Sequence, residues 1–145
     1  MKSHIRNVSA RAKAATYALY PIFKSRLPMR TKLGVYKTYI RPILTYAAPA
    51  WYALVRESNR RTMKAQQSAA LRKVASAPRY VRNSVIQRDL RIEPIECFIT
   101  QLARRMFART ETTTFTHLKD IAPWHARPPD RRAYPRELTQ DPAPI

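Results

Sequence analysis

The apolar residues of this chain recur at three- and four-residue steps, in segments that prolines separate. This spacing gathers apolar side chains on one face of an α-helix, from which they can pack into a core. We therefore predict an all-α fold: a small bundle of about four or five helices with an irregular Pro-rich C-terminal tail. The predicted apolar stripes are Ile5, Val8, Ala12, Ala15 and Leu19; Met29, Leu33, Tyr36 and Ile40; Met63, Gln67, Ala70, Leu71 and Val74; and Ile95, Phe98, Ile99, Leu102 and Met106.

Prolines within these segments predict where helices begin and bend. Pro28 suits the first turn of a helix, where a missing N–H breaks no hydrogen bond. Pro42 falls inside a run that still has helical spacing, so we predict a kink or a new helix start there, with Arg41 displaced from ideal helix geometry. The aromatic residues Tyr46 and Trp51 follow in an apolar setting, and we assign both to packing in the core.

The character of the chain changes after residue 110. Six of the twelve prolines lie from Pro123 onward, the apolar periodicity is lost, and from Glu111 onward five basic residues balance five acidic ones. A chain of 145 residues is long enough for one domain with a modest core. We predict one helical domain in residues 1–110 and an irregular, partly disordered tail in residues 111–145.

Positive charge is concentrated in the predicted domain. The formal net charge is +19, and residues 1–56 contain eleven Lys and Arg with no Asp or Glu. A field of that sign attracts polyanions, of which nucleic acid is the commonest in a cell. Ribosomal-type binders, polymerase subdomains and membrane-surface helices share this signature. No apolar run is long enough to span a membrane, and the basic residues are spread over several elements, which disfavours a membrane role.

The segment 58–74 carries a basic stripe beside its apolar stripe. Arg61, Lys64, Ser68 and Arg72 recur at three- and four-residue steps, and no acidic residue stands among them. A helix with these two stripes can pack on its own protein and offer cations to phosphates. A solvated polar face is the alternative explanation. The candidate nucleic-acid-binding residues are Arg61, Lys64 and Arg72, helped by Lys13, Arg79 and Arg82.

The first helix also interleaves basic and aromatic residues on one face. Such a face suits a phosphate backbone and exposed bases, although a solvated face is the commoner explanation. The residues concerned are Lys2, Arg6, Lys13, Tyr17 and Tyr20.

Motifs that carry catalysis are absent from the sequence. The single glycine, Gly34, excludes glycine-rich nucleotide-binding loops. Polymerases and metal-dependent nucleases hold two cations with clustered carboxylates, whereas here the first acidic residue is Glu57 and the aspartates stand alone. We therefore predict no catalytic residue, no metal site and no cofactor. The single cysteine, Cys97, stands among apolar residues, which predicts a buried, inert thiol in an intracellular protein.

Several short motifs, spaced along residues 4–107, form a set. They are Arg41-Pro42-Ile43-Leu44-Thr45-Tyr46, Ala50-Trp51, Gln66-Gln67 with Leu71-Arg72, and Ala77-Pro78-Arg79-Tyr80-Val81-Arg82-Asn83 with Asp89-Leu90. This combination resembles the C-terminal region of reverse transcriptases from non-LTR retrotransposons, most strongly those of the jockey-like elements of insects.

The resemblance implies a part of an RNA-directed DNA polymerase. In that family the region follows the catalytic palm and includes the helical thumb, which grips the template–primer duplex. The family's paired catalytic aspartates lie upstream of this region, so no activity of this chain alone is expected. The implied partners are nucleic acid, as an RNA–DNA hybrid or structured RNA, and a palm domain supplied by the intact element. Action in retrotransposition would place the protein in the nucleus.

Two residues depart from the family pattern, in which glycine is often found where this chain has Ala47 and Ser76.

Two alternatives from other functional classes also stay open. One is a stand-alone basic RNA-binding protein, and the other is a self-associating helical interaction module.

Overall fold

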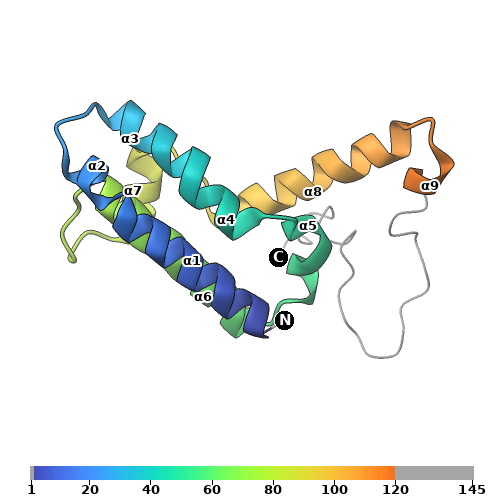
Figure 1. Cartoon of the computed structure of the whole chain (residues 1–145), viewed down its shortest axis with the longest axis horizontal. Helices are drawn as coiled ribbons and strands as arrows, with labels where there is room; N and C mark the ends of the chain where they lie inside the picture. Colours follow the sequence, from blue (N-terminus) through green and yellow to red (C-terminus); the bar gives the residue numbers. More distant parts are fainter. Residues whose placement is uncertain (1, 120–145) are drawn as a thin grey trace. The chain divides into compact units, whose positions relative to one another are not determined.

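The computed structural model describes residues 2–119, and every regular element within this range is helical (Figure 1). The predicted all-α fold is therefore confirmed. The helices are α1 (Lys2–Ala18), α2 (Tyr20–Lys24), α3 (Met29–Val35), the π-helical η1 (Tyr36–Ile40), α4 (Arg41–Thr45), α5 (Ala48–Trp51), the 3₁₀ turn η2 (Tyr52–Leu54), α6 (Glu57–Val74), α7 (Asn83–Asp89), α8 (Ile95–Thr112) and α9 (Thr116–Lys119).

The described residues divide into two compact units that interleave along the chain. The first unit consists of residues 2–46 and 56–95, and the second of residues 47–55 and 96–119. We predicted a division between residues 1–110 and 111–145 from the change in composition. The two units are defined by spatial contact, so they do not test that division. The prediction of an irregular tail is wrong where the structure describes it as helical, since α8 continues to Thr112 and α9 follows at Thr116–Lys119. Residues 120–145 lie outside the described range, so that part of the tail stays a prediction.

Helix α6 is the centre of the first unit. It contacts α1, α2, α3, η1 and α7, and α1 runs alongside it (Figure 1). The buried face of α6 is the predicted stripe from Met63 to Val74. Fully burying a side chain as large as leucine or phenylalanine contributes about 1.5–3 kcal/mol, so this face contributes substantially to the stability of the unit. The cluster around its C-terminal half contains Phe23, Tyr36, Ile40, Ala70, Leu71, Val74, Ile86 and Ile92.

Prolines divide the N-terminal half into shorter helices than the spacing alone suggested. Pro21 and Pro42 each stand in the first turn of a new helix, and Pro28 immediately precedes another. The break predicted at Pro42 is confirmed, because the turn before it, η1, widens into a π-helix. A wider turn accommodates a proline ring that would otherwise clash with the carbonyl four residues earlier.

The predicted displacement of Arg41 from helix geometry is wrong. Its backbone angles, φ −58° and ψ −42°, are those of an ordinary α-helix. The adjustment falls one residue earlier, at Ile40, which has φ −92° and ψ −50°. The π-helical turn thus absorbs the constraint of Pro42 before Arg41 is reached.

Three residues that are not glycine adopt the left-handed region: Ala47 at φ 50°, Ser76 at φ 52° and Arg91 at φ 51°. Ser76 ends α6 in a Schellman motif, in which the Ala77 N–H donates to the Arg72 carbonyl and the Ser76 N–H to the Lys73 carbonyl. Ala47 and Ser76 are also the two positions at which the resemblance noted in the sequence implies glycine. A left-handed backbone favours glycine because other residues bring Cβ too close to the carbonyl oxygen.

In the second unit, the predicted packing of Trp51 is confirmed, since its side chain is buried. The neighbouring Tyr52 is also buried and donates a hydrogen bond of 2.9 Å to the Glu96 carboxylate in the first turn of α8. The predicted stripe of α8 is confirmed at Ile95, the last residue of the first unit, and at Ile99 in the second, since both are fully buried.

Three residues predicted to pack in the core are exposed: Met29 at 41%, Tyr46 and Cys97. Tyr46, at the C-terminus of α4, is 79% exposed, because α4 ends at Thr45 and the chain turns before the next helix. Cys97 is exposed as well. It lies two residues from both Ile95 and Ile99, and two residues correspond to about 200° around a helix, so burial of the isoleucines turns Cys97 outward.

Candidate nucleic-acid interface

An open groove of about 430 Å³ lies in the first unit, on the side of α6 away from its buried face. We call it the basic groove. The residues on α6 that line it are small or polar, and the connector between α6 and α7, residues 75–82, supplies its opposite wall. Its lining consists of Ala65, Ser68, Ala69, Arg72, Arg79 and Asn83. Two of the six predicted binding residues, Arg72 and Arg79, are thus brought together.

Arg72 braces the connector. Its guanidinium donates three hydrogen bonds: to the Pro78 carbonyl at 2.5 Å, to the Val81 carbonyl at 2.8 Å and to Asn83 Oδ1 at 2.7 Å. The guanidinium of arginine carries five N–H donors in one rigid plane, so it can donate to several acceptors at once. The compact ammonium of lysine is less suited to acceptors that lie apart. Arg72 therefore holds the segment that carries Arg79 and Arg82, and its contact with phosphate stays a prediction.

Arg61 and Lys64 lie on α6, about three and two turns before Arg72. Arg61 is largely exposed, and its Nε is 3.6 Å from the Glu57 carboxylate one turn earlier. Our prediction that no acidic residue neutralises this stripe is therefore wrong at its first member, because α6 begins at Glu57, one residue before the predicted start. An exposed pair of this kind contributes only about 0.3–0.5 kcal/mol, so Glu57 leaves most of the charge of Arg61 available.

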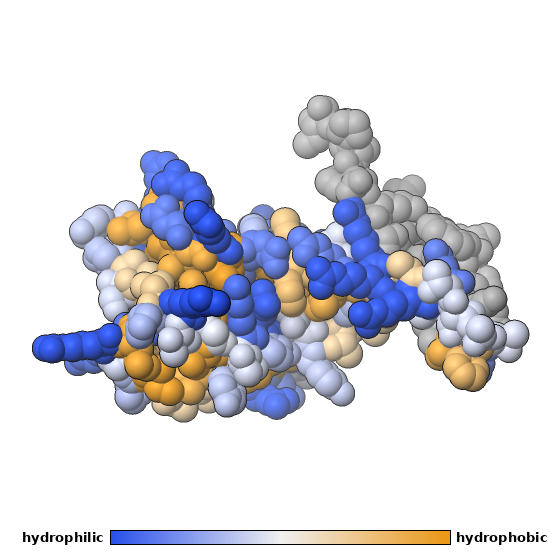
Figure 2. Space-filling model, turned by 90° about the horizontal axis from the view of Figure 1, so that it is seen from above, coloured by the Kyte–Doolittle hydropathy of each residue, from blue (hydrophilic) through white to orange (hydrophobic). Residues whose placement is uncertain are grey.

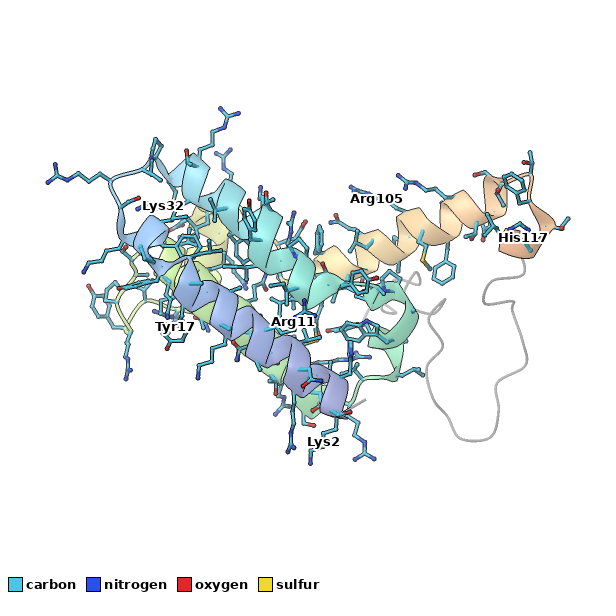
Figure 3. The ribbon with its side chains drawn as sticks, in the orientation of Figure 1. Lys2, Arg11, Tyr17, Lys32, Arg105 and His117 are labelled. Atoms are coloured by element: carbon cyan, nitrogen blue, oxygen red, sulfur yellow. The ribbon has the colours of Figure 1, made fainter. Side chains whose placement is uncertain are left out.

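Lys13 lies on α1 and Arg82 in the connector, and both are exposed but do not line the basic groove. Tyr17, also on α1 (Figure 3), is in contact with a different cation. The Lys73 ammonium of α6 lies 3.4 Å from the centroid of the Tyr17 ring and 5.3 Å from that of Tyr20. These cation–π contacts join α1, α2 and α6, so the two rings have a structural role whether or not they also meet bases.

The first unit carries a large excess of positive charge. Residues 2–46 contain ten Lys and Arg and residues 56–95 another ten, against three acidic residues. Each of those three faces an arginine: Glu57 lies beside Arg61, Asp89 beside Arg88 and Glu93 beside Arg41. No further carboxylate within the unit is left to neutralise the other cations. Lys32 is withdrawn from the surface, at 9% exposure (Figure 3).

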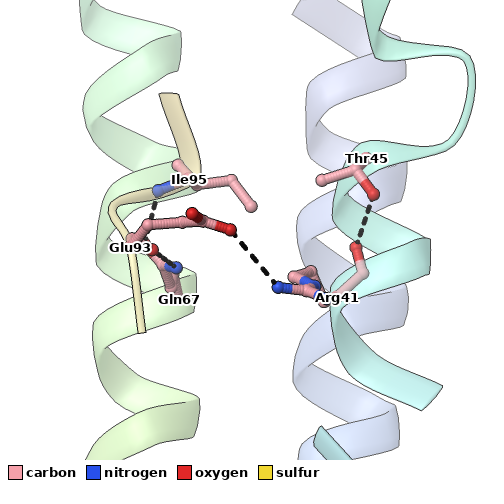
Figure 4. A network of polar contacts seen from close by, with 5 residues as sticks. All are labelled: Arg41, Thr45, Gln67, Glu93 and Ile95. Carbon is pink, nitrogen blue, oxygen red and sulfur yellow. Dashed lines mark hydrogen bonds and ion pairs between the residues drawn. The ribbon is translucent and has the colours of Figure 1, made fainter. Parts of the chain in front are cut away.

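Residues of the sequence motifs build a polar network inside the first unit (Figure 4). Gln67, only 1% exposed, donates to the Glu93 carbonyl at 2.9 Å and accepts from the Ile95 N–H at 2.8 Å. The Glu93 carboxylate lies 3.7 Å from the Arg41 guanidinium, and the Thr45 hydroxyl donates to the Arg41 carbonyl. The network ties α4 and α6 to the first residue of α8. The motif residues Arg41, Thr45 and Gln67 therefore stabilise the fold and contribute little to the surface.

Tyr36 lies beside this network, fully buried in the core. Its hydroxyl has no partner at ordinary hydrogen-bond distance within the described part of the chain. Burial raises the pKa of the phenol, and the nearby Gln67 amide and Arg41 charge oppose that rise.

No group of three or more His, Cys, Asp or Glu in residues 2–119 could hold a metal ion. No helix in that range is long and apolar enough to cross a membrane. Several large apolar side chains are exposed, and apolar areas are visible among hydrophilic ones in Figure 2. The exposed large apolar side chains of the first unit include Leu27, Met29, Tyr39, Tyr46 and Tyr80.

Sequence reasoning missed three members of the groove lining, Ala65, Ala69 and Asn83. Alanines on the polar side of a helix carry no chemical signal of their own. They matter only because the connector folds back over them, and nothing in the local spacing predicts that return.

Comparison with known proteins supports the resemblance. The chain is 26% identical over 108 residues to the RNA-directed DNA polymerase from mobile element jockey of Drosophila melanogaster, which covers 73% of this chain and 12% of that protein. It is 28% identical over 141 residues to the probable RNA-directed DNA polymerase from transposon X-element of the same species, covering 93% of this chain and 15% of the relative. The predicted relationship is thus confirmed as distant homology.

The chain therefore spans about an eighth of the length of these relatives. A third relative, the probable RNA-directed DNA polymerase from transposon BS, is 32% identical over 73 residues, half of this chain. No protein-family model matches the chain. No solved structure matches it either.

Proposed function

We propose that this chain, a distant homologue of part of the RNA-directed DNA polymerases of non-LTR retrotransposons, supplies a thumb-like surface that grips the backbone of a template–primer duplex. The single observation that carries the proposal is the charge of the first unit. Its three carboxylates are all beside arginines, and most of its Lys and Arg are left without a carboxylate. Such a surface favours a polyanion.

The proposed mechanism is contact with phosphates, without reading of sequence. Lysine and arginine contacts to phosphate set the position of a protein on a duplex but carry no sequence information. Arg61, Lys64, Arg79 and Arg82 are the proposed contacts on α6 and the connector, with Lys13 on α1. An RNA–DNA hybrid would be recognised by its shape and backbone. Catalysis would come from a palm domain, because a polymerase holds its metal ions with clustered carboxylates. No such cluster is found in residues 2–119.

The test is binding of the chain to a labelled RNA–DNA hybrid over a salt series. The five proposed phosphate contacts predict a slope of about −4.5 in a plot of log affinity against log salt concentration. The Arg61→Gln, Lys64→Gln, Arg79→Gln variant should lose about three units of that slope. Glutamine is used because a glutamate at position 61 would repel Glu57, and Arg72 is spared because it braces the connector.

A matched variant separates the location of charge from its amount. Lys24→Gln, Arg26→Gln, Arg30→Gln removes the same three charges from exposed positions around α2 and α3. This variant should retain more of the salt slope than the Arg61→Gln, Lys64→Gln, Arg79→Gln variant. Circular dichroism should show that both variants are folded. Equal losses would mean that net charge alone drives binding, as in a general basic RNA-binding protein. Absence of binding by the parent would contradict the proposal, and sedimentation would then test self-association.

A further inference from the structure

The basic groove has the size and lining of a site for one nucleotide, and this inference rests on the proposed function. Its volume, about 430 Å³, lies within the range of roughly 300–1,000 Å³ typical of small-ligand sites. A contact with a single phosphate oxygen needs no cavity, since an exposed lysine can make it. A groove of this volume adds room for the sugar that joins successive phosphates.

The lining divides into a charged wall and a small-residue floor. Arg79 and Asn83 come from the connector side, while Ala65 and Ala69 lie one turn apart on α6. Alanine side chains leave the helix surface open to close approach by another backbone. An apolar floor suits the carbon face of a sugar, and the arginine wall suits its phosphate.

Two polar side chains that line the groove have no hydrogen-bond or ion-pair partner among the described residues. Neither the Arg79 guanidinium nor the Ser68 hydroxyl makes a hydrogen bond or ion pair with any residue in the range 2–119. No carboxylate lines the groove. The acidic residue on α6, Glu57, is eleven positions before Ser68, roughly 16 Å along the helix axis. Arg79 therefore faces the groove without a competing anion of the lining.

Arg72 fixes the shape of the groove. Its three hydrogen bonds tie the connector at Pro78, Val81 and Asn83, on both sides of Arg79. The wall is thus held in place before a ligand arrives, which reduces the conformational entropy lost on binding.

We propose that the basic groove is a one-nucleotide subsite for the sugar–phosphate backbone of one strand of the bound duplex. Arg79 contacts the phosphate, the sugar rests on Ala65 and Ala69, and the Ser68 hydroxyl lies within the same groove to bond either group. The subsite binds backbone and not base, so it adds affinity without sequence preference.

The experiment fills the groove without changing charge. In the Ala65→Leu, Ala69→Leu variant, two exposed alanines become larger residues of high helix propensity, so α6 should persist. Affinity for the RNA–DNA hybrid should fall about tenfold, and the salt slope should lose about one unit as the Arg79 contact is broken. Arg79→Gln should cause a similar loss, and combining it with the filled groove should add little.

The matched control is Ala10→Leu, Ala14→Leu, which adds the same bulk to exposed alanines four residues apart on α1. It should change affinity less than twofold. If the filled groove binds the hybrid as the parent does, the subsite is wrong and the proposed function stands. If the parent does not bind the hybrid, both are wrong.

Competition distinguishes the backbone from an isolated anion. Inorganic phosphate, at ionic strength held constant with chloride, should not displace the hybrid from the parent more than from the filled variant. Selective displacement from the parent would identify a site for a free phosphate ion and would overturn the nucleotide subsite.

Discussion

The two faces of α6 contrast in what they contact and in how tightly they are specified. Met63, Gln67 and Leu71 on one face are buried, and Gln67 uses both ends of its amide on the backbone of Glu93 and of Ile95, where α8 begins. Ala65 and Ser68 on the other face line an open groove. The contrast teaches that the motif resembling reverse transcriptases is partly structural. Its glutamine secures the fold, whereas its arginine at position 72 shapes the surface.

The largest expected effect breaks the buried face. Gln67→Ala leaves the Glu93 carbonyl and the Ile95 N–H without their partner, and each unpaired buried group costs about 1–3 kcal/mol. We expect the free energy of unfolding to fall by about 2–4 kcal/mol, measured by urea denaturation.

The neighbouring Gln66→Ala is the control for this prediction. Gln66 has the same chemistry but is only half-buried and makes no hydrogen bond within residues 2–119. Its replacement should change the free energy of unfolding by less than about 0.5 kcal/mol. Equal effects of the two substitutions would show that the two faces do not differ as described.

An intermediate effect is expected on the groove face. Arg72→Lys keeps the charge but loses the planar donor set that joins Pro78, Val81 and Asn83. The free energy of unfolding should fall by about 1–2 kcal/mol, with faster amide hydrogen exchange in the connector. Arg61→Lys, at an exposed ion pair, should cost less than about 0.5 kcal/mol. A neutral Arg72→Lys would show that the connector is held by its own turns.

The smallest effect sharpens the contrast at the C-terminus of α6, where two neighbours should respond with opposite sign. Ser76→Gly relieves a left-handed backbone at φ 52° and should stabilise by about 0.5–1 kcal/mol. Ala75→Gly, at φ −81° in the right-handed region, should destabilise by at least about 0.5 kcal/mol. Thermal unfolding of the two variants measures both changes in stability. If Ser76→Gly were destabilising, the serine side chain would have to stabilise this C-terminal cap.

Much of the fold could be predicted because its causes are local. Periodicity identified the helices and their buried faces, and Pro42 marked the break that became a π-helical turn. The left-handed backbone at Ala47 and Ser76 could also have been predicted, since the resemblance noted in the sequence implies glycine at both positions. Cys97 was misassigned from its apolar neighbours, although its two-residue offset from Ile95 and Ile99 indicates the opposite side of the helix.

The sequence by itself determined that the chain is helical, strongly basic and related to RNA-directed DNA polymerases, because helix formation, charge and homology are properties of residues and their order. Only the tertiary structure decided which arginines support the fold and which line a groove. Arg41, Arg72 and Arg79 are chemically identical, and they differ in the partners that the fold gives them. Arg41 faces the Glu93 carboxylate and Arg72 the carbonyls of the connector. Arg79 lines the groove and has no hydrogen-bond or ion-pair partner among residues 2–119. Such contacts depend on how the chain returns on itself, which local spacing does not encode.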